Sequence, residues 1–206
     1  DLSSNDYLGL AQHPLLTQRM AAAVLAEGVG STGSRLLRGH REAHAALEEH
    51  AARFFATEAA LYFGSGFSPN FTLFTTLPQR HDAVIFDERI HASVREGIHA
   101  GKADAYRALH NDVNSFADAI ARARKKGARK LWLAVESVYS MDGDRAPLKD
   151  LETLDAVLIV DEGPANQVQE ASTVVEVSAD LPNVIDKQRG GLGFTFQLQV
   201  RIADHV

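Results

Sequence analysis

The chain has 206 residues, of which 45% are hydrophobic and 23% charged, with a net charge of −6 and no cysteine. These proportions are typical of a globular domain, and the interspersed charges leave no basic face for nucleic acid. No apolar run reaches the ~20 residues that span a bilayer, no secretory leader is recognisable, and disulfides, thiolate metal sites and thiol catalysis are excluded, so we expect a cytoplasmic protein without a metal site.

Apolar runs alternate with amphipathic segments along the chain, which predicts an α/β fold with a mostly parallel sheet flanked by helices. The first predicted helix runs from Pro14 to Glu27 and ends at Gly28, which suits a helix C-cap. The second predicted helix covers residues 42–56. The side chains of this helix that we expect to face the core are Ala46, Leu47, Phe54 and Phe55.

A short buried strand is predicted over residues 59–63, and the glycines that follow it break the strand into a third helix. Four further strands are predicted at 83–86, 105–109, 131–138 and 157–160. The last two are apolar throughout, as in strands covered on both faces. A helix is predicted to begin near His91, and another to run from Asp112 or Asn114 to Lys126 and end at Gly127.

The connection between the last two strands is short. A parallel crossover usually needs a dozen or more residues with a helix, and residues 147–155 supply nearly all of this one. The spacing therefore predicts an unusually tight crossover between these two strands.

Polar residues stand where these strands end, at the edge where open α/β sheets bind ligands. Ser140 and Asp142 lie in the turn after strand 131–138, and Asp161 ends the last strand. Gly66 and Phe67 open a helix, where backbone N–H groups can hold an anion. Each feature also has an ordinary interpretation as a helix cap, a turn former or a surface residue.

Four segments resemble one family in their order and spacing. They read SSNDYLGL at 3–10, GSTGSRLLRGH at 30–40, SGFSPN at 65–70 and VESVYSMDGDRAPL at 135–148. They are similar to the α-oxoamine synthases, pyridoxal-phosphate enzymes that condense an amino acid with an acyl thioester. The resemblance covers about residues 1–162. It implies a truncated fold-type I transferase, with part of the cofactor-binding large domain at 1–162, a divergent tail at 163–206 and no C-terminal small domain.

The resemblance also implies roles for single residues toward pyridoxal 5′-phosphate. Asp161 would face the pyridine nitrogen and keep it protonated. The ring of His91 would stack on the pyridine face, as part of the catalytic machinery. The implied cofactor contacts are Gly66, Phe67 and Ser140. The implied substrate-side contacts are Arg35 and His40, and the segment 110–112 fits the family pattern as well as a simple strand end with an N-cap.

The match weakens after Asp161. Pro164 stands where relatives carry a histidine, and proline has neither a side-chain donor nor a backbone N–H. Lys187, followed by glycines, is placed like the Schiff-base lysine, although Val184 replaces the family threonine. The alternative is that Lys187 is a solvated surface lysine.

The implied activity is a decarboxylative condensation of an amino acid with an acyl thioester of coenzyme A or acyl carrier protein, in a homodimer without nucleic acid or membrane partners. The chain looks most like the branch that joins alanine to a pimeloyl thioester in biotin synthesis, and branches that use glycine or serine stay open. The alternative is a catalytically inactive fragment that at most binds cofactor or a partner chain.

Overall fold

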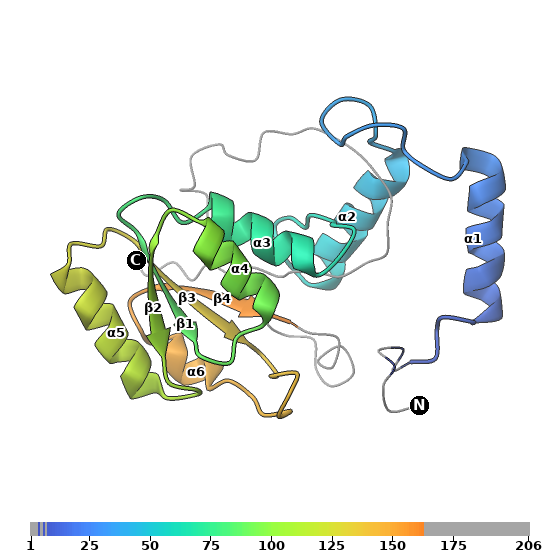
Figure 1. Cartoon of the computed structure of the whole chain (residues 1–206). Coiled ribbons are helices and arrows are strands. Elements are labelled where there is room, and N and C mark those ends of the chain that lie inside the picture. The colour runs from blue at the N-terminus through green and yellow to red at the C-terminus, as the bar shows by residue number, and fades with distance from the viewer. Residues whose placement is uncertain (1–3, 5, 7, 163–206) are drawn as a thin grey trace. The chain divides into compact units, whose positions relative to one another are not determined.

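The computed structural model describes residues 4, 6 and 8–162 of the chain (Figure 1). The described residues fall into two compact units, one up to His44 and one from Ala45 onward. The predictions for Pro164, for Lys187 and for a divergent tail at 163–206 lie outside the described residues. No helix in the described part of the chain is long and apolar enough to cross a membrane.

The first unit contains helix α1 (Pro14–Glu27), which confirms the predicted helix. Pro14 occupies the first turn, where its missing N–H costs nothing. Gly28 ends the helix with φ of 82°, a left-handed backbone that glycine adopts without strain. Within the described chain none of the residues of α1 is buried.

Helix α2 (Glu42–Phe54) is two residues shorter than predicted, and its expected core face is wrong. Phe54 is 65% exposed and Ala46 is also exposed, whereas the buried residues on α2 are His44 and Ala51. Leu47 and Phe55 are only half-buried. An apolar stripe is buried only where another element packs against it, and the described residues do not cover this one.

The predicted strand at 59–63 is not formed over residues 59–62. A strand needs a neighbour that takes up its backbone N–H and C=O groups. Here the Tyr62 N–H donates to Oε1 of Glu48 on α2, at 2.9 Å. The backbone N–H of Tyr62 is thus bound by a side chain of the preceding helix.

The other predicted strands form one parallel sheet in the order β2-β1-β3-β4. The strands are β1 (Ala83–Asp87), β2 (Asp104–Ala108), β3 (Leu131–Glu136) and β4 (Val157–Asp161). The helices that accompany them are α3 (Phe67–Thr76), α4 (Ala92–Ala100), α5 (Val113–Lys125) and α6 (Leu148–Leu151). The predicted α/β class is therefore confirmed.

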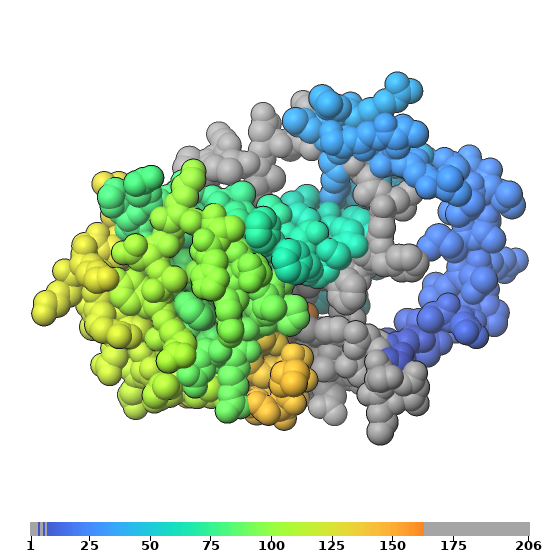
Figure 2. Space-filling model, viewed as in Figure 1, coloured from blue at the N-terminus to red at the C-terminus, as the bar shows by residue number. Residues whose placement is uncertain are grey.

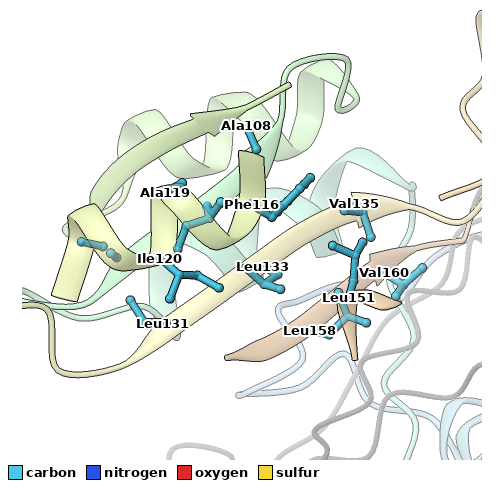
Figure 3. Packing of buried hydrophobic residues seen from close by; sticks show 13 residues of the cluster. Ala108, Phe116, Ala119, Ile120, Leu131, Leu133, Val135, Leu151, Leu158 and Val160 are labelled. Atoms are coloured by element: carbon cyan, nitrogen blue, oxygen red, sulfur yellow. The ribbon is translucent and has the colours of Figure 1, made fainter. Parts of the chain in front are cut away.

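The sheet is covered on both faces, which explains why β1 and β3 are apolar up to the acidic residue that ends each of them. On one face, Ile85, Leu133 and Leu158 pack with Phe116 and Ile120 of α5 and with Leu151 of α6 (Figure 3). On the other face, Val84, Trp132 and Ile159 pack with residues of α3 and α4. Alternate residues of one strand thus belong to opposite layers of the core.

Helices α3 and α4 approach closely because two glycines face α3. A Cβ atom at Gly101 would lie 2.7 Å from the carbonyl oxygen of Phe74, and one at Gly97 would lie 3.0 Å from the carbonyl oxygen of Asn70. The outer surfaces of α4 and α3 form one continuous face, in green and teal in Figure 2. This contact fixes where the first turn of α4 stands relative to α3.

The short connection between β3 and β4 is accommodated by a turn and one turn of helix. Val138 and Arg145 form an isolated antiparallel bridge that closes the turn, and α6 supplies the only helix of this crossover. From β2 the chain returns past β1 to β3, so the strand order reverses between β1 and β3. Open α/β sheets bind ligands at such a reversal, outside the carboxyl ends of the strands.

Candidate functional site

Three acidic residues end three neighbouring strands at this edge of the sheet. Asp87 ends β1, Glu136 ends β3 and Asp161 ends β4, and Glu136 and Asp161 are register partners. Asp87 is fully buried and Glu136 is 4% exposed. Sequence reasoning singled out Asp161 alone, although the same signal, an acid that closes an apolar strand, also marks the other two.

Asp161 and His91 belong to one hydrogen-bond network that runs through α3 and α4. Nδ2 of Asn70 lies 2.8 Å from Oδ2 of Asp161 and 2.9 Å from Oγ of Ser93. Oγ of Ser93 lies 2.7 Å from Nδ1 of His91. The structure thus brings together two predicted site residues through Asn70 and Ser93, which the sequence analysis did not identify.

The electrostatics of Asp161 favour a positively charged neighbour. Burial raises the pKa of Asp161, while the Asn70 amide and the nearby His91 lower it, and the balance lies above the ordinary range. Among the described residues, no lysine or arginine forms an ion pair with this carboxylate. A cationic group beside Asp161 would therefore stabilise the carboxylate that burial destabilises.

Glu136 connects the other predicted residues. Its carboxylate accepts hydrogen bonds from the backbone N–H of Ser140, at 3.4 Å, and of His91. Burial, followed by the negative charge of Asp161, raises the pKa of Glu136 to about 7. Ser140 and His91 are both exposed, so both side chains are accessible at this edge.

Gly66 and Phe67 stand at the start of α3, one turn before Asn70. Gly66 is the N-cap, with helical φ of −67° and ψ of −25°, and no side chain caps it. Oγ of Ser65 accepts the N–H of Ser68 at 3.3 Å. The first N–H groups of a helix have no acceptor inside the helix, and the helix dipole favours an anion there. Gly66 and Phe67 thus lie at the start of a helix, as predicted, but residues 59–62 before this turn form no strand.

The turn that carries Ser140 is tied to β1 by His110. Its Nδ1 lies 2.9 Å from Oδ1 of Asp87, and its Nε2 lies 2.6 Å from Oδ2 of Asp144. Asn111 makes parallel bonds to the same two carboxylates, at 2.9 and 2.7 Å. Burial lowers the pKa of His110, but the two carboxylates outweigh it and raise the pKa overall. Sequence reasoning missed this role, while the predicted N-cap is confirmed, since Asp112 accepts the N–H of Asn114 and Ser115.

The residues of the Gly30–His40 segment belong to the first unit. Arg35 and His40 are both half-buried, and the His40 ring stacks on that of His44 with centroids 5.7 Å apart. The guanidinium of Arg41 donates to the carbonyl of Glu27 at 2.9 Å, which ties this segment to the end of α1. A contact between Arg35 or His40 and a substrate stays a prediction.

Comparison with known proteins agrees with this arrangement. Residues 1–186 match the family model described as aminotransferase class I and II. The chain is 42% identical over 201 residues to 8-amino-7-oxononanoate synthase of Geobacter sulfurreducens, covering 93% of this chain and 50% of the relative. It is 44% identical over 164 residues to the enzyme of that name from Chromobacterium violaceum, covering 78% and 42%. The chain thus spans about half the length of the curated relatives it matches.

Solved structures give the same picture. Serine palmitoyltransferase of Sphingomonas wittichii superposes with a TM-score of 0.72 at 31% identity, over 76% of this chain and 40% of that one. A serine palmitoyltransferase solved with its PLP internal aldimine gives 0.72 at 30% identity, over 76% and 40%. For 8-amino-7-oxononanoate synthase of Francisella tularensis the TM-score is 0.60 at 25% identity, over 77% and 43%.

Proposed function

Because this chain belongs to the aminotransferase class I and II family, we propose that it forms part of the active site of a pyridoxal-phosphate-dependent acyltransferase of the 8-amino-7-oxononanoate synthase type. The reaction joins an amino acid, alanine, to a pimeloyl thioester of coenzyme A or acyl carrier protein and releases carbon dioxide. The observation that carries the proposal is the hydrogen-bonded network of Asp161, Asn70, Ser93 and His91 at the reversal point of the sheet.

The residues at this edge fit the cofactor in three respects. Asp161 offers a desolvated carboxylate that a protonated ring nitrogen would neutralise. The exposed ring of His91 offers a flat surface for an aromatic ligand. The start of α3 at Gly66 and Phe67 suits the phosphate. When bound, pyridoxal phosphate supplies an electron sink for the carbanion at the α-carbon of the amino acid.

The side chains then have separate tasks. Asp161 would hold a proton on the ring nitrogen of the bound cofactor through its negative charge. His91 would pack against that ring. Ser140, placed by the Glu136 contact to its N–H, offers its hydroxyl as a donor to the cofactor. Lys187 would provide the amine that bonds the cofactor and moves the α-proton, a role that stays a prediction because Lys187 lies outside the described residues.

Cofactor binding tests the proposal. Addition of pyridoxal phosphate to the chain should produce a visible absorbance band, and borohydride reduction followed by peptide mapping should label Lys187. Asp161→Asn should weaken cofactor binding about tenfold, because an ionic hydrogen bond in a desolvated site is lost. The matched control is Asp118→Asn, since Asp118 is exposed on α5. Labelling scattered over surface lysines, or equal binding by both variants, would instead favour the inactive fragment.

The substrate choice is decided by a second assay. The resemblance leaves open the branches that use other amino acids, namely serine palmitoyltransferase, glycine C-acetyltransferase and 5-aminolevulinate synthase. Thiol release from a pimeloyl thioester should be fastest with alanine in the presence of an intact enzyme that contains this sequence. Faster release with serine or glycine would assign the chain to one of the other branches.

We also propose that the protein works in the cytoplasm as a homodimer. The resemblance to the family supports the dimer, and helix α1 carries apolar side chains that a second chain would be able to contact. Those side chains are Leu15, Leu16, Met20, Val24 and Leu25. Light scattering after size exclusion should give twice the 22.4 kDa mass of the chain.

A further inference from the structure

We infer that Asn70 is a positioning residue that sets the orientation of both Asp161 and His91. The inference rests on the proposed function, because it concerns the two groups that would face the cofactor. Asn70 is 3% exposed, and Ser93 is fully buried. Neither residue needs to touch the cofactor. Each acts through hydrogen bonds to side chains that do.

The donors and acceptors in this network can be assigned from chemistry alone. An ionised carboxylate only accepts, so the Asn70 atom that faces Asp161 must be the NH2 group. Both hydrogens of that group are used, one for Oδ2 of Asp161 and one for Oγ of Ser93. Oδ1 of Asn70 is buried without a partner in the described structure. A flipped amide would turn an oxygen toward the carboxylate, so the carboxylate fixes the direction of the amide.

The hydrogen bonds of Ser93 determine the tautomer of His91. Because Oγ of Ser93 accepts from Asn70, its own hydrogen is free to point at Nδ1 of His91, 2.7 Å away. The backbone N–H of Ser93 also donates to Nδ1, at 3.2 Å. Nδ1 is therefore an acceptor, and His91 carries its proton on Nε2. Asn70 thus links the carboxylate and the imidazole in one directed chain of hydrogen bonds.

Helix packing makes the link possible. Asn70 lies on α3, His91 and Ser93 lie at the start of α4, and Gly97 lets the two helices meet at backbone distance. The two hydrogen-bond partners of Asn70 are distant in the sequence: Ser93 lies 23 residues and Asp161 lies 91 residues after it. A separation of α3 and α4 wider by about an ångström would break the 2.9 Å bond between Asn70 and Ser93, so this bond depends on the close helix contact.

The first test needs no cofactor. In the isotope-labelled chain, the carboxyl carbon of Asp161 should titrate at a higher pH in Asn70→Leu than in the unmodified chain, because the donor that favours the charged form is gone. Asn70→Asp, which keeps the size of the side chain, should raise the titration midpoint further, since two carboxyl groups would then face each other. Asn114→Leu, at an exposed site on α5, is the matched control and should leave the midpoint unchanged. The inference would be overturned if both variants at position 70 kept native circular dichroism and the titration midpoint of Asp161 were the same as in the unmodified chain.

The second test determines which ring nitrogen of His91 carries the proton. Long-range proton–nitrogen correlation should show His91 protonated at Nε2 with Nδ1 as an acceptor. Ser93→Ala should move the Nδ1 resonance, whereas Ser115→Ala, which removes a hydroxyl bonded to the Leu109 N–H, should not. Protonation of His91 at Nδ1 in the unmodified chain contradicts the assigned network.

The third test connects the network to the cofactor. Asn70→Leu should weaken pyridoxal phosphate about tenfold in the unmodified chain but hardly at all in Asp161→Asn, because its effect passes through the carboxylate. Additive losses would show that Asn70 acts independently of Asp161 and would overturn the positioning role. Asp161→Asn without any effect on binding would refute the proposed function instead, and the two resonance tests would still decide the inference.

Discussion

Replacement of Glu136 by glutamine should make the protein more stable at alkaline pH and flatten the pH dependence of its stability. Glu136 is 4% exposed at the end of β3, and its pKa is raised to about 7 by burial and by the charge of Asp161. Glutamine keeps the shape of the side chain and an oxygen that can accept the N–H groups of Ser140 and His91. It removes the charge and replaces one carboxylate oxygen with an NH2 group.

The sign follows from proton linkage. The folded state holds a proton on Glu136 up to about pH 7, while the unfolded chain loses it near the ordinary glutamate pKa of 4.5. The stabilisation is therefore complete below pH 4.5 and is lost as the pH rises through 7. The raised pKa sets an upper limit of about 3 kcal/mol on this loss, and coupling to Asp161 reduces it to about 2 kcal/mol. At pH 8 the glutamine variant should exceed the unmodified protein by about that amount, and at pH 4.5 the two should agree.

Urea unfolding between pH 4.5 and 8.5 measures the effect. Trp132 is the only tryptophan, is buried on β3 and serves as the fluorescence reporter. Glu96→Gln, at an exposed position on α4, is the matched control and should leave the pH profile unchanged. Equal pH slopes for Glu136→Gln and the unmodified protein would refute the assignment of a buried, neutral Glu136 in the folded state.

Three further predictions concern the elements that hold the site together. Gly101→Ala should lower the free energy of unfolding in urea by about 1–3 kcal/mol, because its Cβ would lie 2.7 Å from a backbone oxygen. Gly64→Ala, which has open space around it, should lower this free energy by less than about 1 kcal/mol. Equal effects would contradict the close packing of α3 and α4. His110→Gln should speed proteolysis within the Tyr139–Asp144 turn, because the contact between His110 and Asp144 is lost. In the unmodified protein, protonated His110 contributes stability that is present below pH 6.5 and is lost as the pH rises through the raised pKa of His110, and the variant should lack this pH-dependent loss. An unchanged cleavage rate would show that His110 does not hold the turn. Asp112→Ala should lower the unfolding free energy by about 1 kcal/mol through loss of the α5 N-cap, and Asp118→Ala on the same helix should not; a loss below 0.3 kcal/mol, by the same assay, would deny the cap.

Much of the architecture could be predicted because its signals are local. The apolar runs of β1, β3 and β4 became strands since a run covered on both faces needs no alternation. Asp112, Gly28 and Gly127 begin or end helices by rules that involve neighbours in sequence. Asp161 and His91 were found by resemblance together with their place at a strand end and a helix start. Where the prediction failed, the missing information was a partner. The strand predicted at 59–63 is not formed over residues 59–62, where Glu48 of α2 accepts the Tyr62 N–H, and among the described residues no element covers the apolar face of α2.

The amino-acid sequence by itself determined the class of fold, the edge of the sheet where polar residues gather and the family to which the chain belongs. Only the tertiary structure revealed that Asn70 serves Asp161 and Ser93, that Glu136 joins His91 to Ser140, and that His110 ties a turn to β1. The reason is that the contacts of Asn70 with Ser93 and Asp161, and of His110 with Asp87, join residues 23 to 91 positions apart in the sequence. A hydrogen bond between residues so far apart in the sequence forms only when whole helices pack on a sheet. No local pattern of residues encodes how those helices are placed.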